Sequence, residues 1–437
     1  MSFFLNGIHL PHRKNTAEQS AVRMADVKSV TIPMQMNLGA PATPVVKVGD
    51  VVKVGTLIAE ATGVFSAPIH ASVSGKVTKI TDVPGASGSM KAIVIESDGE
   101  MTPYEAMRAP EITNREDLIG AIRDCGLVGL GGAGFPTHVK FNVDPARIEV
   151  LVINGAECEP YITCDSLTMV ERVDDMEYAI KALEEHLGIK RVIIGIEKDK
   201  KSAILKMNEM ASRMEGVTVK TLPQVYPQGG EKVLVYHTTG KVISTGKLPI
   251  DVGCIVCNCT TIAELGRYLK TGMPLVEKCI TVDGGAVKEP KNVIVPIGVS
   301  MADVFEFCGG LKDAPEKVLY GGPMMGVTVP SMDVPVLKST NAILALTAKE
   351  ARLPKTTACI RCGSCTNACP FGLAAAEILL AYKKKDTAML ESLSVNTCME
   401  CGCCSFVCPA NRPLVQTNKL AKQLIREEKA KEEKKNG

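Results

Sequence analysis

Tryptophan is absent from this chain of 437 residues, and aromatic side chains make up only 4% of it. Few aromatic rings leave few platforms on which nucleotide bases could stack, and a net charge of +2 gives no strongly basic face for a phosphate backbone. No nucleic-acid partner is therefore expected. The sequence also lacks an apolar run of the roughly 18 to 20 residues that cross a bilayer, and its N-terminal segment has only a short apolar start. These absences predict a soluble protein that is not exported.

Cysteine, by contrast, is abundant. The chain has 17 cysteines, and nine of them lie between Cys359 and Cys408. Without an export signal, such clustering favours metal binding over disulfide bonds and indicates a reducing compartment. The remaining composition, with 46% hydrophobic and 22% charged residues, is ordinary for a globular protein. A chain of this length is expected to form about three or four domains.

The nine cysteines contain two runs with the spacing C-x2-C-x2-C-x3-C-P. This spacing is typical of proteins that hold two four-iron, four-sulfur (4Fe-4S) clusters, in which the cysteine before each proline binds the other cluster. On that crossed pattern the first cluster is bound by Cys359, Cys362, Cys365 and Cys408, and the second by Cys398, Cys401, Cys404 and Cys369. Zinc, the alternative, prefers two separated pairs and has no use for a third cysteine in each run. Cys403 has no place in this scheme and is interpreted as a packed thiol.

The first 110 residues alternate apolar and polar residues between glycine turns, which predicts short strands in a small all-β unit. The segment VKVGDVV resembles the hairpin of the barrel-sandwich hybrids found in biotinyl and lipoyl carrier domains. Those carriers present a modifiable lysine on a turn, whereas the corresponding turn here, residues 66–70, reads SAPIH. A structural or docking role is therefore expected for this domain.

Residues 111–270 show strands alternating with helices, which predicts a parallel α/β domain. Helices are expected at 115–125 and 199–214, and buried strands at 147–155 and 190–198. Residues 271–348 are expected to form a small module of strands around one helix. The cysteine runs fall in a domain at 349–420, and the charged segment 421–437 is expected to be a solvated helical tail.

Within the α/β segment, residues 126–141 read GLVGLGGAGFPTHVKF. The glycines at 129, 131 and 134 satisfy G-x-G-x-x-G, but they follow a predicted helix, whereas the Rossmann fingerprint follows a strand. Glycines without a Cβ still let backbone N–H groups approach a phosphate or a flat ring, and Lys140 could neutralise phosphate charge. The alternative, on spacing alone, is a mobile loop with a surface lysine.

The same stretch resembles the flavin-binding loop of the NADH-oxidising flavoprotein of respiratory complex I, whose pattern is G-R-G-G-A-G-F-P-T-G-x-K. Further segments resemble that family in the same order: NGAECEP at 154–160, GGEK at 229–232 and CNCTT at 257–261. The module at 271–348 is similar to the β-grasp (SLBB) domain that follows there. With a sandwich hybrid before it and two clusters after it, the layout resembles the RnfC component of Rnf-type ion-translocating NAD:ferredoxin oxidoreductases. The resemblance implies a multidomain α/β protein with a Rossmann-like domain for FMN and NADH and a C-terminal helical two-4Fe-4S ferredoxin domain.

The resemblance also implies roles for individual residues. FMN would be held at its phosphate and ribityl chain by Gly129, Gly131, Gly132, Gly134 and Lys140, and elsewhere by Asn154, Glu157 and Asn258. The nicotinamide nucleotide would contact Phe135, Glu159 and Glu231. Three positions depart from the family pattern: Leu130 replaces an arginine, Ala156 an aspartate that touches flavin, and Lys232 a glutamate. The first two departures imply weaker flavin binding.

Five further cysteines lie near the predicted flavin site: Cys158, Cys164, Cys254, Cys257 and Cys259. The last three form C-x2-C-x-C, which is either a metal-binding hook or a set of buried small apolar side chains.

The implied function is that of a peripheral electron-transfer component on the cytoplasmic face of the cell membrane, with NAD(H), FMN and two 4Fe-4S clusters. Flavin is required there because nicotinamide transfers two electrons together whereas each cluster transfers one. Membrane subunits of the complex would be direct partners, and ferredoxin an indirect one. Two alternatives remain open, a soluble cobalamin reductase of similar layout and a non-catalytic electron carrier whose nucleotide pocket has been lost.

Overall fold

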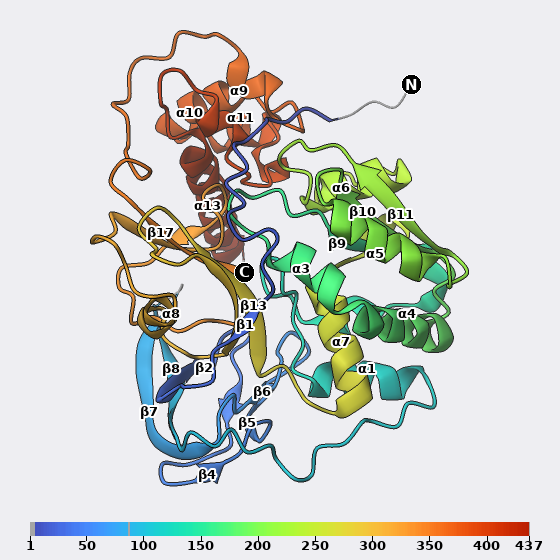
Figure 1. The fold of residues 1–437 in the computed structure, drawn as a ribbon. Helices are drawn as coiled ribbons and strands as arrows, with labels where there is room; N and C mark the ends of the chain where they lie inside the picture. Colours follow the sequence, from blue (N-terminus) through green and yellow to red (C-terminus); the bar gives the residue numbers. More distant parts are fainter. Residues whose placement is uncertain (1–4, 86–87, 437) are drawn as a thin grey trace.

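The computed structural model describes residues 5–85 and 88–436, which form four packed parts (Figure 1). A small β-domain lies at one end of the molecule and a helical domain at the other. An α/β domain and a six-stranded sheet lie side by side between them. These fold types follow the predicted order along the chain.

The β-domain consists of two small sheets that share an apolar core. The first has the strand order β2-β8-β7-β4, with β2 (Ser29–Pro33), β4 (Val51–Val52), β7 (Gly75–Gly85) and β8 (Gly88–Ser97); the second has the order β3-β5-β6, with β3 (Thr43–Pro44), β5 (Leu57–Glu60) and β6 (Ile69–His70). Ile32, Ile58 and Ile93 are fully buried in the shared core. Alternation of apolar and polar residues produces this inward face because successive strand side chains point to opposite sides.

The α/β domain is built on a parallel sheet with the order β11-β10-β9-β12. Its strands are β9 (Val150–Gly155), β10 (Val192–Glu197), β11 (Val217–Leu222) and β12 (Cys254–Asn258). Its helices are α1 (Arg115–Asp124), α2 (Thr137–Phe141), η1 (Pro145–Arg147), α3 (Cys164–Glu171), α4 (Val173–Leu187), α5 (Lys201–Ala211), α6 (Glu231–Thr239), η2 (Pro249–Val252) and α7 (Cys259–Thr271). All residues of β10 are buried, as expected for a strand covered by helices on both faces. The four elements predicted from periodicity correspond to α1, β9, β10 and α5.

The third part is a six-stranded sheet with the order β1-β14-β13-β17-β15-β16. It contains β1 (Val22–Arg23), β13 (Glu277–Asp283), β14 (Lys291–Pro296), β15 (Lys317–Tyr320), β16 (Val327–Thr328) and β17 (Ala342–Leu346), with one helix, α8 (Met301–Phe307). Strand β1 comes from the N-terminal segment and pairs in parallel with β14, so that Val22 lies opposite Val293. The chain therefore contributes to this sheet before it enters the β-domain.

The fourth part is helical and carries both cysteine runs. It consists of α9 (Ser364–Asn367), α10 (Ala375–Lys383), α11 (Thr387–Ser392), η3 (Val395–Thr397), α12 (Cys403–Phe406) and α13 (Leu414–Asn436). Ala421 and Ile425 of α13 are buried against α10 and α11, so the predicted tail at 421–437 begins as a packed helix face rather than as a solvated one. Among residues 5–85 and 88–436, no helix combines the length and the apolar character needed to cross a membrane.

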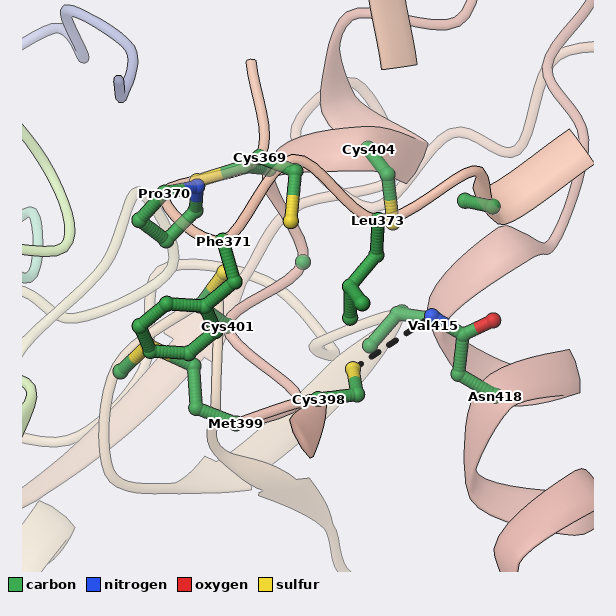
Figure 2. A pocket seen from close by; sticks show the side chains of 13 residues that line it. Cys369, Pro370, Phe371, Leu373, Cys398, Met399, Cys401, Cys404, Val415 and Asn418 are labelled. Atoms are coloured by element: carbon green, nitrogen blue, oxygen red, sulfur yellow. Dashed lines mark hydrogen bonds between the residues drawn. The ribbon is translucent and has the colours of Figure 1, made fainter. Parts of the chain in front are cut away.

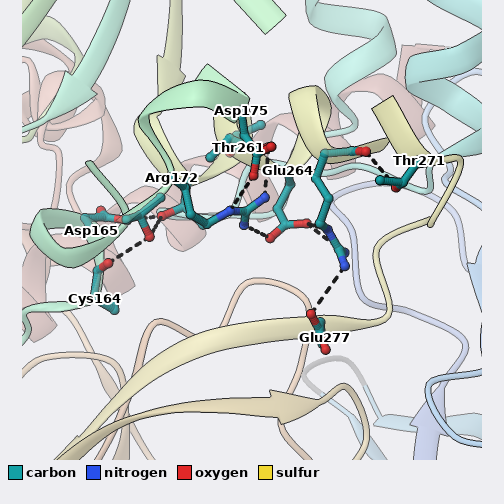
Figure 3. A network of polar contacts seen from close by, with 12 residues as sticks. Cys164, Asp165, Arg172, Asp175, Thr261, Glu264, Thr271 and Glu277 are labelled. Carbon is teal, nitrogen blue, oxygen red and sulfur yellow. Dashed lines mark hydrogen bonds and ion pairs between the residues drawn. The ribbon is translucent and has the colours of Figure 1, made fainter. Parts of the chain in front are cut away.

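A network of ion pairs ties the helices of the α/β domain to strand β13 (Figure 3). Arg172, between α3 and α4, binds both Asp175 and the buried Glu264 of α7. Arg267 donates to Glu264 at 3.0 Å and to Glu277 of β13 at 3.3 Å. Burial alone would raise the pKa of Glu264, but the two guanidinium groups hold it below its usual value. The carboxylate therefore stays charged and links three elements.

Lys338 is fully buried where the β-domain, the α/β domain and the six-stranded sheet meet. Its ammonium group donates to the carbonyl oxygens of Pro68 and Gly126, both at 2.7 Å. Pro68 belongs to the turn at which carrier domains would present their lysine, and Gly126 begins the glycine-rich stretch. Burial lowers the pKa of Lys338 to about 7.

We expect Lys338→Met to lower the free energy of unfolding by about 1–3 kcal/mol, because two buried carbonyl groups lose their donor. The unfolded lysine keeps its proton up to a pKa of 10.5, whereas the folded one releases it near a pKa of about 7. The unfolded chain thus binds more protons between these values, and the lysine's contribution to stability rises with pH. Urea unfolding of both proteins at pH 7.5 and 9.5 should show that part of the rise only in the parent. An equal pH dependence in parent and variant would contradict the assignment, and the exposed Lys384→Met is the matched control.

Candidate functional site

The candidate site lies at the carboxyl ends of β9 and β12. From β9 the chain adds β10 and β11 on one side of the sheet and β12 on the other. At such a switch point the connections leave in opposite directions, and the crevice between them is where open α/β sheets bind ligands. Asn154, near the end of β9, and Asn258, at the end of β12, are register partners at this edge. The two asparagines predicted to contact flavin therefore lie side by side.

The glycine-rich loop between α1 and α2 reaches the same edge. A Cβ at Gly131 would come within 2.6 Å of Nδ2 of Asn258, so only glycine permits this approach. Gly132 is exposed, and a Cβ there would meet no atom within 4 Å. The N–H of Gly129 donates to the carbonyl of Phe135 at 2.9 Å and closes the loop. Bare backbone thus borders an open space, which fits the close approach of a phosphate or a flat ring.

Gly134 and Phe135, at the end of the loop, rest on the β-domain. Gly134 has a left-handed φ of 69°, and its carbonyl accepts from the N–H of Leu38 at 2.9 Å. The ring of Phe135 meets that of Phe65 edge to face, with centroids 6.0 Å apart. The β-domain therefore supports the loop from outside, which is a structural role for a domain without a carrier lysine.

Lys140 lies on α2, beside the same sheet edge. Its ammonium group donates to the carbonyl of Val256 at 2.7 Å, two residues before Asn258. A lysine ammonium carries three protons, so this bond leaves two for an anion. The cation is thus close to the open side of the glycine loop, as the sequence predicts for a phosphate-binding lysine.

Leu130 replaces the family's arginine, and the structure shows what this residue does. Its side chain is buried in the core. Its N–H donates to Oγ1 of Thr261 at 3.0 Å, and its carbonyl accepts from Nζ of Lys278 at 2.6 Å. Lys278, in β13, is fully buried, and burial lowers its pKa to about 8. Because Leu130 packs inward, the open side of the loop is formed by backbone.

Asn258 and Glu157 both lead to the start of α3. Asn258 donates to Asp165 at 2.7 Å, while its Oδ1 caps α7. The carboxylate of Glu157 accepts from the N–H of Asp165 at 2.7 Å and from the hydroxyl of Ser166 at 2.9 Å. Burial raises the pKa of Glu157 to about 7. These contacts fix the loop that follows β9 against the loop that follows β12.

Glu159 and Glu231, both predicted to contact the nicotinamide nucleotide, lie in different environments. The carboxylate of Glu159 accepts from the N–H groups of Met324 and Met325 at 3.0 and 2.8 Å, and burial raises its pKa to about 7. It thereby binds a loop of the six-stranded sheet. Glu231, by contrast, is exposed at the start of α6.

The lysine that organises the loop after β9 was missed by the sequence analysis. Lys14 donates to the carbonyl groups of Glu157 and Glu159, both at 2.8 Å, and to that of Ile162. The turn that carries the two predicted glutamates is therefore wrapped around a side chain from the N-terminal segment. No signal in the sequence marks it, since Lys14 stands in an ordinary polar stretch.

Four predicted ligands of the second cluster line one cavity (Figure 2). They are Cys369 from the first run and Cys398, Cys401 and Cys404 from the second. Leu373 and Val415 give the cavity apolar walls. The sulfur of Cys398 accepts from the N–H of Glu400 and from Nδ2 of Asn418, both at 3.4 Å. Thiols from both runs and donors aimed at sulfur fit the requirements of a 4Fe-4S cluster.

The four predicted ligands of the first cluster are more exposed as a group. Cys365 is buried and Cys408 half-buried, and both pack on the apolar start of α13. Cys359 and Cys362 are exposed on the loop that precedes α9. The structure thus brings together Cys365 and Cys408, one from each run, with the other two thiols on an outer loop.

The second cavity is joined to the sheet edge by direct contacts. The hydroxyl of Tyr226 donates to the carbonyl of Cys401 at 2.7 Å. Met399 packs so closely on Gly230, just before α6, that no Cβ would fit there. Cys403 is buried beneath the Tyr226 carbonyl, consistent with its interpretation as a packed thiol.

The cysteines of the C-x2-C-x-C segment do not converge. Cys254 packs in a different core cluster from Cys257 and Cys259, because Cys254 and Cys257 lie on opposite faces of β12. All three are buried.

Family models match four segments of the chain in the predicted order. Residues 2–100 match the RnfC barrel sandwich hybrid domain, and residues 122–267 the Nuo51 FMN-binding domain. Residues 279–328 match the SLBB domain, and residues 355–412 the 4Fe-4S dicluster domain. The predicted fold class is confirmed, and so are the predictions of FMN and 4Fe-4S clusters as cofactors.

Three curated relatives are each 40% identical to the chain, and each is the RnfC-type component of its complex. One belongs to the Na(+)-translocating ferredoxin:NAD(+) oxidoreductase complex of Acetobacterium woodii and matches over 431 residues, 97% of both chains. Another belongs to the proton-translocating ferredoxin:NAD(+) oxidoreductase complex of Clostridium ljungdahlii and matches over 378 residues, 85% of this chain and 82% of the relative. The third belongs to the ion-translocating oxidoreductase complex of Rhodobacter capsulatus and matches over 434 residues, 97% and 83%. The chain therefore belongs to the RnfC family of ion-translocating oxidoreductase complexes.

Proposed function

We propose that this chain is an oxidoreductase component of an ion-translocating ferredoxin:NAD(+) oxidoreductase and exchanges electrons between NAD(H), FMN and two 4Fe-4S clusters. The observation that carries the proposal is the junction between the second cysteine cavity and the sheet edge. Met399 lies between two cavity cysteines and packs on Gly230, while the adjacent Gly229 carbonyl accepts from Asn154 at 2.9 Å. A pocket for a one-electron centre and an edge suited to a nucleotide are thus neighbours in one chain.

FMN, when bound, would accept two electrons from NADH as a hydride and release them one at a time, which the clusters require. In our proposal Lys140 and the N–H groups from Gly129 to Gly134 bind the phosphate. Asn154 and Asn258 offer both donors and acceptors to the rest of the flavin. Glu157 keeps the loop after β9 in place through its contacts with α3.

Phe135 forms an apolar wall for the nicotinamide nucleotide in this proposal. Glu159 is already bound by two backbone N–H groups, so we assign it to holding that wall against the six-stranded sheet. The exposed Glu231 remains free to accept from ribose hydroxyls.

The crossed ligand sets give the clusters different positions. Cys369, Cys398, Cys401 and Cys404 would hold the cluster next to the flavin edge. Cys359, Cys362, Cys365 and Cys408 would hold the cluster beside the exposed loop. Electrons would then pass between flavin and the outside through the second cluster and then the first.

We further propose that the chain is a peripheral subunit on the cytoplasmic face of the cell membrane, where membrane subunits of the complex are its partners and ferredoxin exchanges electrons with it indirectly. Two observations support this. The relatives are named as subunits of ion-translocating complexes, and no helix in residues 5–85 and 88–436 could cross a membrane. The cobalamin reductase and the electron carrier without a nucleotide pocket gain no support from the relatives.

Anaerobic titration with NADH tests the proposed function directly. Protein reconstituted with FMN, iron and sulfide should lose its flavin absorbance and then show the EPR signals of reduced 4Fe-4S clusters. Protein without FMN should show neither change, because hydride cannot enter the clusters directly. Fully loaded protein that NADH leaves oxidised would refute the proposal.

Crossed ligation predicts the effect of a single cysteine change. The parent should bind about eight irons, and Cys369→Ala should lower this toward about four by loss of the cluster that Cys398, Cys401 and Cys404 hold. Cys403→Ala is the matched control, since a packed thiol outside the ligand sets should leave both clusters intact. Iron analysis gives the stoichiometry, and EPR identifies the cluster lost. Loss of the other cluster in Cys369→Ala would reject the crossing.

Lys140→Gln should weaken FMN binding by about 10- to 150-fold, since a charge-assisted contact contributes roughly 1.5–3 kcal/mol. Glutamine can still donate to the Val256 carbonyl, so this variant removes the charge and keeps the strand contact. Gly132→Val should bind FMN more weakly still, while folding normally, because its side chain would enter space that is open in the free protein. Fluorescence titration with FMN measures both, with unchanged iron content as the control. Parent-like affinity in Lys140→Gln would remove the phosphate assignment.

A further inference from the structure

We propose that the loop of the first cysteine run is a docking surface for an acidic one-electron carrier protein. The docking loop, residues 352–363, joins the six-stranded sheet to the helical domain and runs along the outside of the molecule (Figure 1). The inference rests on the proposed function, because only a loop that holds a cluster can pass electrons to a partner.

The two cysteine runs contain equivalent loops with different surroundings. Residues 359–362 read CIRC and residues 398–401 read CMEC. Arg361 and Glu400 occupy the same position, and both have a left-handed φ, of 57° and 64°. The two loops therefore share a backbone conformation, so a difference in their contacts comes from their neighbours.

The second loop is covered by its own chain. Met399 packs on Gly230, and Glu400 forms an ion pair with Lys422 at 2.6 Å. In the first loop, Ile360 is 70% exposed, and Arg361 is exposed and has no ion-pair partner in the described part of the chain. The position that meets the nucleotide edge in one loop is thus open in the other. A second redox protein is the occupant that completes the comparison.

The charge of the docking loop specifies the partner. Residues 351–376 contain no aspartate or glutamate, but they contain Arg352, Lys355 and Arg361, all exposed. Within residues 5–85 and 88–436, none of the three forms an ion pair. Unpaired cations of one sign attract a surface of the opposite sign, so the complementary partner is acidic.

A fourth cation joins the docking loop from the end of the second run. Thr357 donates to the carbonyl of Ala410 at 3.0 Å, and Nη1 of Arg412 donates to the carbonyl of Thr357 at 3.1 Å. Nδ2 of Asn411 also donates to the carbonyl of Lys355 at 3.3 Å. Arg412, four residues after Cys408, therefore lies beside the docking loop.

The docking loop also offers an apolar centre. Leu353 is 80% exposed and Ile360 70%, which is unusual for large apolar side chains that lie close in sequence. Apolar contacts within a charged rim are typical of specific protein interfaces. Because Ile360 lies between Cys359 and Cys362, a protein that covers it comes close to the first cluster. An anionic membrane also attracts cations, but it would not account for apolar residues placed between cluster ligands.

The test compares two probes of opposite charge, an acidic plant-type ferredoxin and basic cytochrome c, for binding to the fully loaded parent. The parent should bind ferredoxin more tightly, and salt should weaken that binding because the charges are exposed. The double variant Arg352→Glu/Lys355→Glu should bind ferredoxin about tenfold less tightly and lose most of the salt dependence. Lys47→Glu is the matched control, an exposed lysine of the β-domain at the opposite end of the molecule.

Arg361→Gln supplies a second variant in the docking loop, and iron content with EPR shows whether its clusters are intact. Equal binding of both probes by the parent, or an equal effect of Lys47→Glu, would overturn the proposal. So would binding to phosphatidylglycerol vesicles, but not to ferredoxin, that depends on these cations. Charge-dependent ferredoxin binding by protein whose clusters NADH cannot reduce would support the docking surface and refute the proposed function.

Discussion

Lysine side chains that bind backbone carbonyl groups hold the nucleotide edge of this molecule together. Loops that meet at a junction between domains have carbonyl groups without a sheet or helix partner, and a buried carbonyl without a donor is destabilising. Lys338 donates to the start of the glycine-rich stretch, and Lys278 to its middle, at Leu130. Lys14 does the same for the turn after β9. Each lysine comes from a different segment, so the loops take their shape only when all parts are assembled.

This constraint explains why a loop rich in glycine can be well defined. Glycine gains freedom in the unfolded chain, and a loop containing several would be poorly ordered unless held from outside. Buried ammonium groups on one side and the β-domain on the other supply that restraint. The open side at Gly132 then remains available to a ligand, because the contacts that fix the loop all lie behind it.

The two cysteine runs show how one local structure can serve two positions. Their spacing and their backbone are alike, but the second run faces the sheet edge and the first faces outward. A chain that accepts two electrons together and passes them on singly needs one site near the nucleotide and another near the surface. Crossed ligands meet this need, because cysteines from both runs must pack against the same helix, α13.

The sequence by itself determined the local elements. Apolar periodicity located α1, β9, β10 and α5, cysteine spacing identified the ligand sets as a prediction, and the glycine pattern with Lys140 identified the loop. These features depend on neighbours within a few residues, so they can be read from sequence. Tertiary structure alone decided which segments meet: β1 with β14, Asn154 with Asn258, and Lys14, Lys278 and Lys338 with their carbonyl groups. It also decided that Glu159 binds the six-stranded sheet, that α13 buries its first turns, and that one cysteine loop is covered while its counterpart is open. Those outcomes depend on contacts between residues far apart in the chain, which local periodicity does not encode.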